Sequence, residues 1–155
     1  MVTQTTENGR QKCARYWPSS PEPIEGCSAE GCTIEMTEEA DEVDGVIERT
    51  LVLKSKRGER RLRQIQFVDW PDHGVPHDPS HFLVFLRKVR AYREAITDES
   101  PTIVHCSAGV GRTGVTIALD AAASKLEKNL KIDPASLLTE MRRQRGCLIQ
   151  EKGQQ

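Results

Sequence analysis

One stretch, from Thr102 to Leu126, constrains this chain more than any other. It begins with β-branched residues that predict a short strand, continues through a loop of small residues and ends in an apolar pattern typical of a helix. A loop that enters a helix N-terminus presents unpaired backbone N–H groups and the positive end of the helix dipole. The sequence therefore predicts an anion site in this loop, best suited to phosphate. The apolar positions of the expected helix include Ile117, Leu119, Ala122 and Leu126.

Two side chains of this loop add chemistry to the anion site. Cys106 stands at its start, where aimed N–H groups and a nearby cation would lower the thiol pKa and hold a thiolate nucleophile. Arg112 follows in the spacing Cys106-x5-Arg112, and its planar guanidinium can hold two phosphate oxygens at once. The next residue, Thr113, carries a hydroxyl that can bond the sulfur as it leaves the phosphate. The glycines of the loop let the backbone approach an anion closely.

Other interpretations of the loop are open to the sequence. Residues 109–114 match the dinucleotide fingerprint G-x-G-x-x-G, and Asp133 follows about twenty residues on. However, Asp133 precedes Pro134 and indicates a helix cap, and a dinucleotide loop has no use for Cys106 and Arg112. A Walker A loop ends in G-K-[ST], which is absent from this loop. A structural Cys in a glycine-rich turn is the remaining alternative, which a lone Cys would favour.

A second motif runs from Trp70 to Pro76 and reads Trp-Pro-Asp-His-Gly-Val-Pro. Two prolines and a glycine predict a shaped, hinged loop. Taken alone, Asp72 would be a surface carboxylate in a turn. Beside a cysteine-based phosphate site, a mobile carboxylic acid can supply the proton that a leaving oxygen needs.

Together these two motifs resemble the cysteine-dependent protein tyrosine phosphatases, and the run from His105 to Gly114 resembles their tyrosine-specific branch. The resemblance implies an α/β fold with a twisted mixed β-sheet flanked by helices. It also implies hydrolysis of phosphotyrosine in proteins through a cysteinyl-phosphate, with Cys106 as nucleophile, Arg112 as phosphate clamp and Asp72 as general acid and base. The loop residues implied to bind the phosphate with Arg112 are Ser107, Ala108, Gly109, Val110 and Gly111. His105, Trp70 and Pro76 are implied as supporting residues.

Three further residues take roles only through the resemblance. Glu7 precedes a stretch ending in Tyr16-Trp17-Pro18, and its position implies a pairing with Arg112. Gln150 matches the glutamine that orients the hydrolytic water, and Gln154 matches a second glutamine nearby. Glu151 replaces the usual threonine after Gln150. A rival function is a phosphotyrosine-binding module without turnover.

Composition excludes several other classes. The chain has 155 residues, enough for one domain with a core, and its net charge of −1 gives no pull toward nucleic acid or anionic membrane. No signal peptide or apolar stretch long enough to span a bilayer is visible. Five cysteines without regular spacing suit a reducing compartment, so we expect a cytoplasmic catalytic domain. Cys27 and Cys32 lack a second ligand pair for zinc, and we expect no metal and no cofactor.

The rest of the chain predicts elements around these motifs. Val46 to Lys54 and Leu62 to Val68 alternate as antiparallel strands, joined by a turn at Arg57-Gly58. Asp78 before Pro79 and Asp133 before Pro134 each indicate a helix start. The stripe expected to pack from the first of these helices is Phe82, Phe85, Leu86 and Val89.

The resemblance covers essentially all of residues 1–155 but not the whole family domain. It implies a partial catalytic domain, because the Asn-Arg-Tyr loop that stacks on phosphotyrosine and the helix after Gln150 are not matched. Apolar surface left wet forgoes roughly 25 cal/mol per Å². On this ground we expect residues 1–155 alone to be marginally folded and nearly inactive.

Overall fold

Four antiparallel strands form the main sheet of the structure, a computed structural model that describes residues 1–19, 22–26, 31–40, 43–71, 74–76, 78–97 and 100–150. Their order is β3-β4-β5-β6, so neighbours in the sequence are also neighbours in the sheet. The bounds are β3 Ile24–Gly26, β4 Cys32–Glu39, β5 Val46–Ser55 and β6 Gly58–Phe67. A separate two-stranded sheet pairs β1 (Thr6–Glu7) with β2 (Arg10–Gln11).

The β5–β6 hairpin confirms the predicted pair of long strands and the turn between them. Its register runs without a break from Val46 opposite Phe67 to Ser55 opposite Gly58. Gly58 has a φ of 122°, a backbone conformation that favours glycine over any other residue. The hairpin therefore ends where the sequence predicts.

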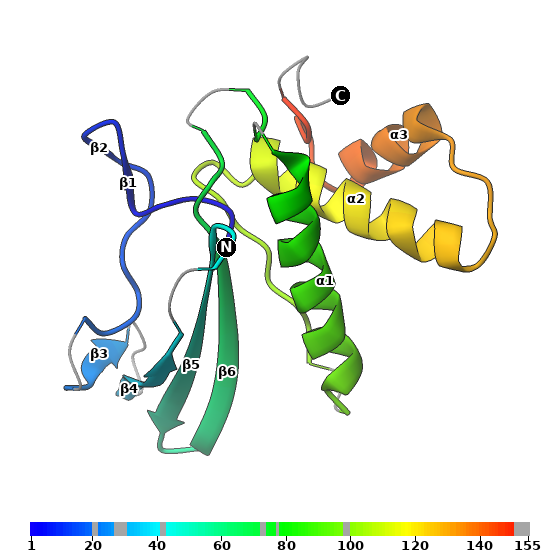
Figure 1. Cartoon of the computed structure of the whole chain (residues 1–155). Helices are drawn as coiled ribbons and strands as arrows, with labels where there is room; N and C mark the ends of the chain where they lie inside the picture. Colours follow the sequence, from blue (N-terminus) through cyan, green and yellow to red (C-terminus); the bar gives the residue numbers. More distant parts are fainter. Residues whose placement is uncertain are drawn as a thin grey trace.

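Three helices follow the sheet in the chain. They are α1 (Pro79–Ala95), α2 (Gly111–Glu127) and α3 (Pro134–Gln144). Asp78 caps α1 by accepting the backbone N–H of Ser80, and Asp133 caps α3 in the same way, as predicted. Figure 1 shows α1 alongside β6, with α2 next to it and α3 further out.

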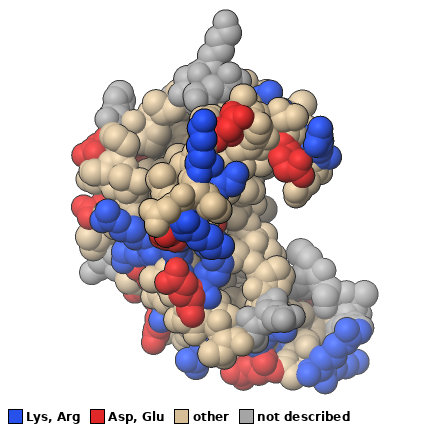
Figure 2. All heavy atoms as spheres, turned by 90° about the vertical axis from the view of Figure 1, so that its right-hand side faces the viewer, with Lys and Arg blue, Asp and Glu red and all other residues tan. Residues whose placement is uncertain are grey.

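Ion pairs join α1 to α2. Asp120 of α2 pairs with Arg90 and with Arg93 of α1. On the face shown in Figure 2, which carries α2 and α3, acidic and basic side chains lie next to one another. This mixture agrees with the net charge of −1.

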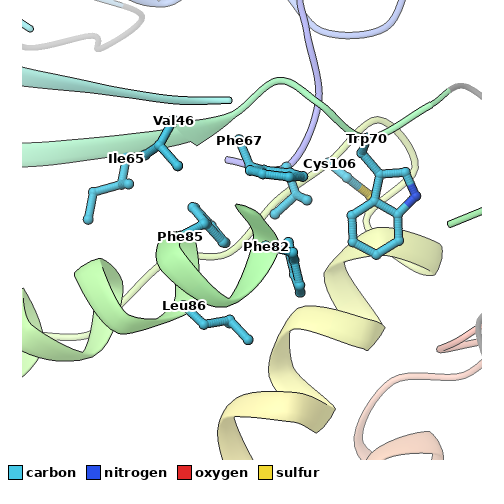
Figure 3. Packing of buried hydrophobic residues seen from close by; sticks show 9 residues of the cluster. Val46, Ile65, Phe67, Trp70, Phe82, Phe85, Leu86 and Cys106 are labelled. Atoms are coloured by element: carbon cyan, nitrogen blue, oxygen red, sulfur yellow. The ribbon is translucent and has the colours of Figure 1, made fainter. Parts of the chain in front are cut away.

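The main core lies between β6 and α1, and Figure 3 shows its aromatic centre. Phe67 packs against Phe82 and Phe85, with ring centroids 5.2 and 5.6 Å apart, and Trp70 packs edge-on against Phe82 at 5.0 Å. Cys106 belongs to the same buried cluster. The predicted stripe of α1 is confirmed for Phe82, Phe85 and Leu86, which are buried, with Val89 partly buried. The core thus supports the base of the Cys106 loop.

Residues 1–3 lie between β6 and the segment that leads to Cys106. The N–H of Met1 donates to the carbonyl of Ile65, and the N–H of Phe67 donates to the carbonyl of Met1, each over 2.9 Å. Met1 thus bonds to the residues on either side of the one opposite it, and this pattern is typical of two parallel strands. The N–H of Val2 donates to the carbonyl of His105 over 2.9 Å on the other side. The segments that lead to Glu7, to Trp70 and to Cys106 therefore lie side by side.

The α/β fold class is confirmed, and two local expectations need correction. Residues 102–104 do not form a strand of a regular ladder, because the bond from Val2 to His105 is not repeated along them in the described part of the chain. The apolar positions of α2 do not mark a buried face, since Ile117 is 39% and Leu126 63% exposed. The buried residues of α2 are in its first two turns, beside the loop.

Candidate active site

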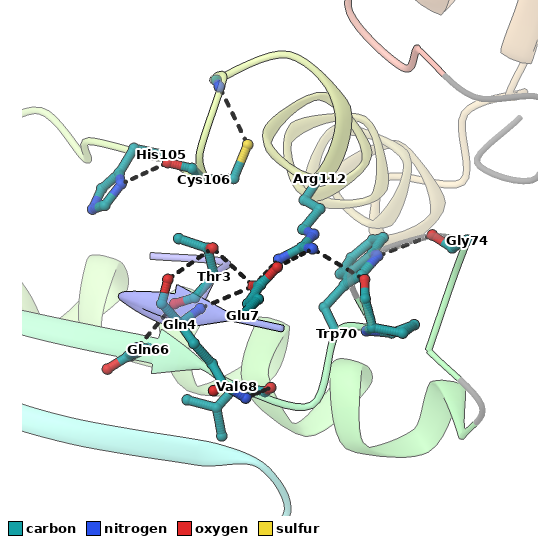
Figure 4. A network of polar contacts seen from close by, with 12 residues as sticks. Thr3, Gln4, Glu7, Gln66, Val68, Trp70, Gly74, His105, Cys106 and Arg112 are labelled. Atoms are coloured by element: carbon teal, nitrogen blue, oxygen red, sulfur yellow. Dashed lines mark hydrogen bonds and ion pairs between the residues drawn. The ribbon is translucent and has the colours of Figure 1, made fainter. Parts of the chain in front are cut away.

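The loop that begins at Cys106 closes around the cysteine sulfur. Gly109 donates its backbone N–H to Cys106 Sγ over 3.3 Å, which Figure 4 shows as the bond across the loop. Gly109 has a φ of 71°, so the turn that aims this N–H inward favours glycine. Cys106 is buried, and α2 begins at Gly111 directly after the loop. The sulfur therefore faces a helix N-terminus, as the sequence predicts.

The surroundings of Cys106 favour its thiolate. Burial by itself would raise the pKa of the thiol, but the Thr113 hydroxyl and the backbone N–H groups of Thr113, Gly109 and Val110 outweigh it and hold the pKa below its ordinary value. The Thr113 oxygen is buried and has no hydrogen bond of normal geometry among the described residues, so it stays available to the sulfur. This arrangement suits a nucleophile.

Arg112 is fixed by a carboxylate from the start of the chain. Glu7 Oε1 accepts from Arg112 Nη1 at 2.5 Å and Oε2 accepts from Nη2 at 2.8 Å, so the contact is bidentate and largely buried. Thr3 and the N–H of Gln4 also donate to Glu7 Oε1. Burial would raise the pKa of Glu7, but the hydrogen bonds from Arg112, Gln4 and Thr3 lower it further than burial raises it. The pairing that the resemblance implied is thus present in the structure.

The loop with the second motif lies against the same arginine. Arg112 Nη2 donates to the carbonyl of Pro71 over 3.0 Å, and the indole N–H of Trp70 donates to the carbonyl of Gly74 over 3.0 Å (Figure 4). Trp70 is buried in the core and Pro76 is half-buried. Asp72, the expected acid, lies outside the described residues. The described part of the loop therefore reaches the site through the Pro71 carbonyl.

The segment after α3 is held against the Cys106 loop. The N–H of Ile149 donates to the carbonyl of Val110 over 3.1 Å, and Arg142 donates to the carbonyls of Leu148 and Ile149. Gln150 follows directly and is exposed, lining a pocket of about 360 Å³ with Arg142 and Cys147. Gln154 lies outside the described residues.

Tyr16 is a site residue that the sequence interpretation missed. Its hydroxyl lies 2.7 Å from His105 Nε2, and His105 Nδ1 lies 3.2 Å from the carbonyl oxygen of Cys106. A carbonyl only accepts, so Nδ1 carries the hydrogen and Nε2 accepts from Tyr16. Burial lowers the pKa of His105, which favours this neutral ring. In the sequence, Tyr16 stands out only as part of the stretch that ends in Pro18, since no local pattern joins it to a residue 89 positions away.

The remaining residues predicted to bind phosphate differ in their exposure. Ser107 and Ala108 are exposed at the mouth of the loop, and Val110 and Gly111 are half-buried at its end. Within the described ranges, no group of three or more His, Cys, Asp or Glu side chains is arranged to hold a metal ion. Among those same residues, no helix has both the length and the apolarity needed to cross a membrane.

Comparison with known proteins places this geometry in a family. The model of the protein-tyrosine phosphatase family matches residues 1–155. Over 99% of its length the chain is 40% identical to tyrosine-protein phosphatase 1 of Caenorhabditis elegans and 42% identical to mouse tyrosine-protein phosphatase non-receptor type 4. It is also 40% identical over 99% of its length to human receptor-type tyrosine-protein phosphatase C. The chain spans 15%, 16% and 12% of these three proteins.

A solved structure agrees. The crystal structure of the catalytic domain of human protein tyrosine phosphatase non-receptor type 18 superimposes with a TM-score of 0.87 at 31% identity, covering 99% of this chain and 54% of that one. Sequence and fold therefore lead to the same result: this chain belongs to the protein-tyrosine phosphatase family.

Proposed function

We propose that the catalytic domain to which this chain belongs hydrolyses phosphotyrosine in proteins in two steps through a cysteinyl-phosphate. The observation that carries the proposal is the bond from the Gly109 N–H to Cys106 Sγ in a loop that opens α2. Amides aimed at a sulfur anion are also aimed at the phosphate oxygens that would lie above it. Arg112, held by Glu7, supplies the positive charge.

In the first step the Cys106 thiolate attacks phosphorus and the bond to the tyrosine oxygen breaks. Arg112 and the loop amides hold the three remaining oxygens, which carry the charge of the transition state. Asp72 gives its carboxyl proton to the leaving phenolate, so that tyrosine departs neutral. Thr113 donates to the sulfur.

In the second step water attacks the phosphocysteine. Asp72, now a carboxylate, takes a proton from that water, and Gln150 orients it. The bond between sulfur and phosphorus breaks, inorganic phosphate leaves and the thiolate is restored. Ile149, fixed to Val110, supports this assignment by holding the Gln150 backbone beside the loop. No cofactor takes part in either step.

The compartment and the extent of the domain also follow as proposals. Cys13, Cys32, Cys106 and Cys147 are free thiols in the structure. Because oxidation would remove the Cys106 nucleophile, we infer that the protein acts in a reducing compartment such as the cytoplasm. We also infer that residues 1–155 are part of a catalytic domain, since they align with 54% of the solved one.

Turnover by Cys106→Ser tests the function. We expect this variant to lose phosphate release from a phosphotyrosine peptide while still binding that peptide. Cys32→Ser is the matched control, because Cys32 lies in β4 and its sulfur donates to the carbonyl of the neighbouring Thr33. Retained turnover in Cys106→Ser would exclude the cysteinyl-phosphate. Binding without turnover by the unchanged chain would instead identify the binding module.

A further inference from the structure

A histidine and an aspartate link the two ends of the loop that contains the expected acid. Asp69 directly precedes Trp70, and His81 lies in the first turn of α1, just after the loop. His81 Nδ1 is 3.1 Å from Asp69 Oδ2 across a separation of 12 residues. One side-chain contact therefore closes the segment from residue 69 to residue 81 at its base.

Asp69 is also fixed from the side of the main sheet. The N–H of Val68 donates to the carbonyl of Gly45 over 2.8 Å, which joins the end of β6 to the turn before β5. A Cβ at Gly45 would overlap the Asp69 side chain, so the carboxylate occupies space that only a glycine leaves free. Gly45 also has a φ of 68°. The position of the Asp69 carboxylate is thus constrained by the backbone around Gly45 and Val68, independently of its contact with His81.

We propose that His81 is a positioning residue, which holds Asp69 to α1 and so fixes where the loop of residues 70–76 leaves the sheet. The catalytic consequence rests on the function proposed above, in which Asp72 of this loop protonates the leaving group. The placement itself does not depend on that function. Trp70 and Pro71 follow Asp69 directly, and they contact Gly74 and Arg112, so a shift of Asp69 is transmitted to the phosphate clamp.

The link depends on pH. The charged groups that face His81 are Asp69 from the loop, Asp44 from the turn before β5, 3.9 Å from Nε2, and Asp78 from the cap of α1. The hydrogen bond to Asp69 raises the pKa of His81 above its ordinary value, with Asp78 and Asp44 acting in the same direction. The imidazolium form is therefore present below that raised pKa and is lost as the pH rises through it. His81 and Asp69 side chains are 37% and 43% exposed, so we expect a modest effect, about two- to fivefold in rate.

The first test observes the loop without using activity. Trp70 reports on it, because its indole N–H is bonded to the Gly74 carbonyl. In NMR spectra of the whole chain, the Trp70 indole N–H shift should titrate between about pH 5.5 and 8.5 with the pKa of His81. His81→Gln and Asp69→Asn should remove that titration. Arg87→Gln, an exposed position on the same helix, is the control and should retain it.

The second test uses the ratio of kcat/KM between the unchanged chain and His81→Gln, in which shared titrations of Cys106 and Asp72 cancel. For a phosphate ester with a poor leaving group the ratio should be about two to five near pH 5.5 and approach one near pH 8.5. For an activated phenol it should stay near one throughout. Thermal midpoints of both variants show whether they are folded.

The outcomes separate the two proposals. The positioning role is overturned if the Trp70 indole N–H chemical shift does not change as His81 titrates. It is also overturned if the ratio of kcat/KM values does not depend on pH and leaving group. Absence of turnover even after a homologous N-terminal segment is fused to the chain overturns the proposed function, while the Trp70 titration still decides the role of His81. A His81→Gln variant that is unfolded also overturns the inference, because the link would then support the fold rather than the loop.

Discussion

The most informative perturbation of the site is Glu7→Gln. It keeps the shape of the side chain and removes its charge, so Arg112 loses one charge-assisted bond and faces an amide. Arg112 and Glu7 side chains are only 11% and 7% exposed, so water replaces the lost bond poorly. The arginine stays in its loop because it also donates to the Pro71 carbonyl.

The magnitude follows from the kind of bond that is lost. A hydrogen bond to a charged group contributes about 1.5–3 kcal/mol, and removing one partner of a buried pair costs about 3–5 kcal/mol. Because a glutamine oxygen still accepts one of the two bonds, the lower range applies. We expect unfolding free energy to fall by about 1.5–3 kcal/mol and kcat/KM to fall roughly 10- to 100-fold, since a loosely held Arg112 clamps phosphate less well.

The lowered pKa of Glu7 determines how its contribution to stability changes with pH. The folded-state pKa of Glu7 lies below its unfolded value, so its contribution to stability is present above the unfolded pKa of about 4.3 and is lost as the pH falls through the folded pKa. The difference in stability between the unchanged chain and Glu7→Gln should therefore be largest near neutral pH and shrink below about pH 4.

Urea denaturation across this pH range and kinetics with a phosphotyrosine peptide measure both effects. Glu35→Gln is the matched control, because Glu35 pairs with the solvent-exposed Lys54, where water screens the interaction. If Glu7→Gln were no less stable and no less active than Glu35→Gln, the reasoning about the buried pair would be wrong.

Three further substitutions test the proposed chemistry. Arg112→Lys keeps the charge but loses the bidentate contact. Phosphate affinity, measured as inhibition by inorganic phosphate, and kcat/KM should each fall by the equivalent of about 1.5–3 kcal/mol. Asp72→Asn should slow hydrolysis of a poor leaving group about 10²–10⁴-fold and of an activated phenol much less, and equal slowing would contradict the acid role. Gly114→Ala places a Cβ 2.8 Å from the Ile149 nitrogen, so the free energy of unfolding should fall by about 1–3 kcal/mol. Because the same change would move Gln150, we expect a burst of phenol release followed by slow turnover.

The local elements of the fold could be predicted from the sequence because their causes are local. Alternation identified β5 and β6, and an aspartate before a proline identified the starts of α1 and α3. The apolar pattern of α2 was less informative. Its buried end contains Arg112 and Thr113, polar residues that serve the loop, while Ile117 is exposed. The spacing of apolar residues does not predict the buried face of α2, because residues of the candidate site occupy its buried first turns.

The residues proposed to react could be identified from the sequence, but most of the residues that contact them could not. Cys106 and Arg112 stand in one short motif whose chemistry is apparent from residue type and spacing. Glu7 required the resemblance, since no physical pattern joins it to Arg112 at a separation of 105 residues. The contacts of Tyr16 and His81 were not predicted, because their partners are set by the tertiary fold.

The order of the segments at the sheet edge explains how these distant residues meet. Residues 1–3 lie between Ile65 and His105. The chain continues from residues 1–3 to Glu7, from β6 to Trp70 and from His105 into the Cys106 loop. Because these three segments are hydrogen-bonded side by side, Glu7, Trp70 and the Cys106 loop lie near one another (Figure 4). The contact between Glu7 and Arg112 is thus a product of long-range pairing between segments and of no local pattern.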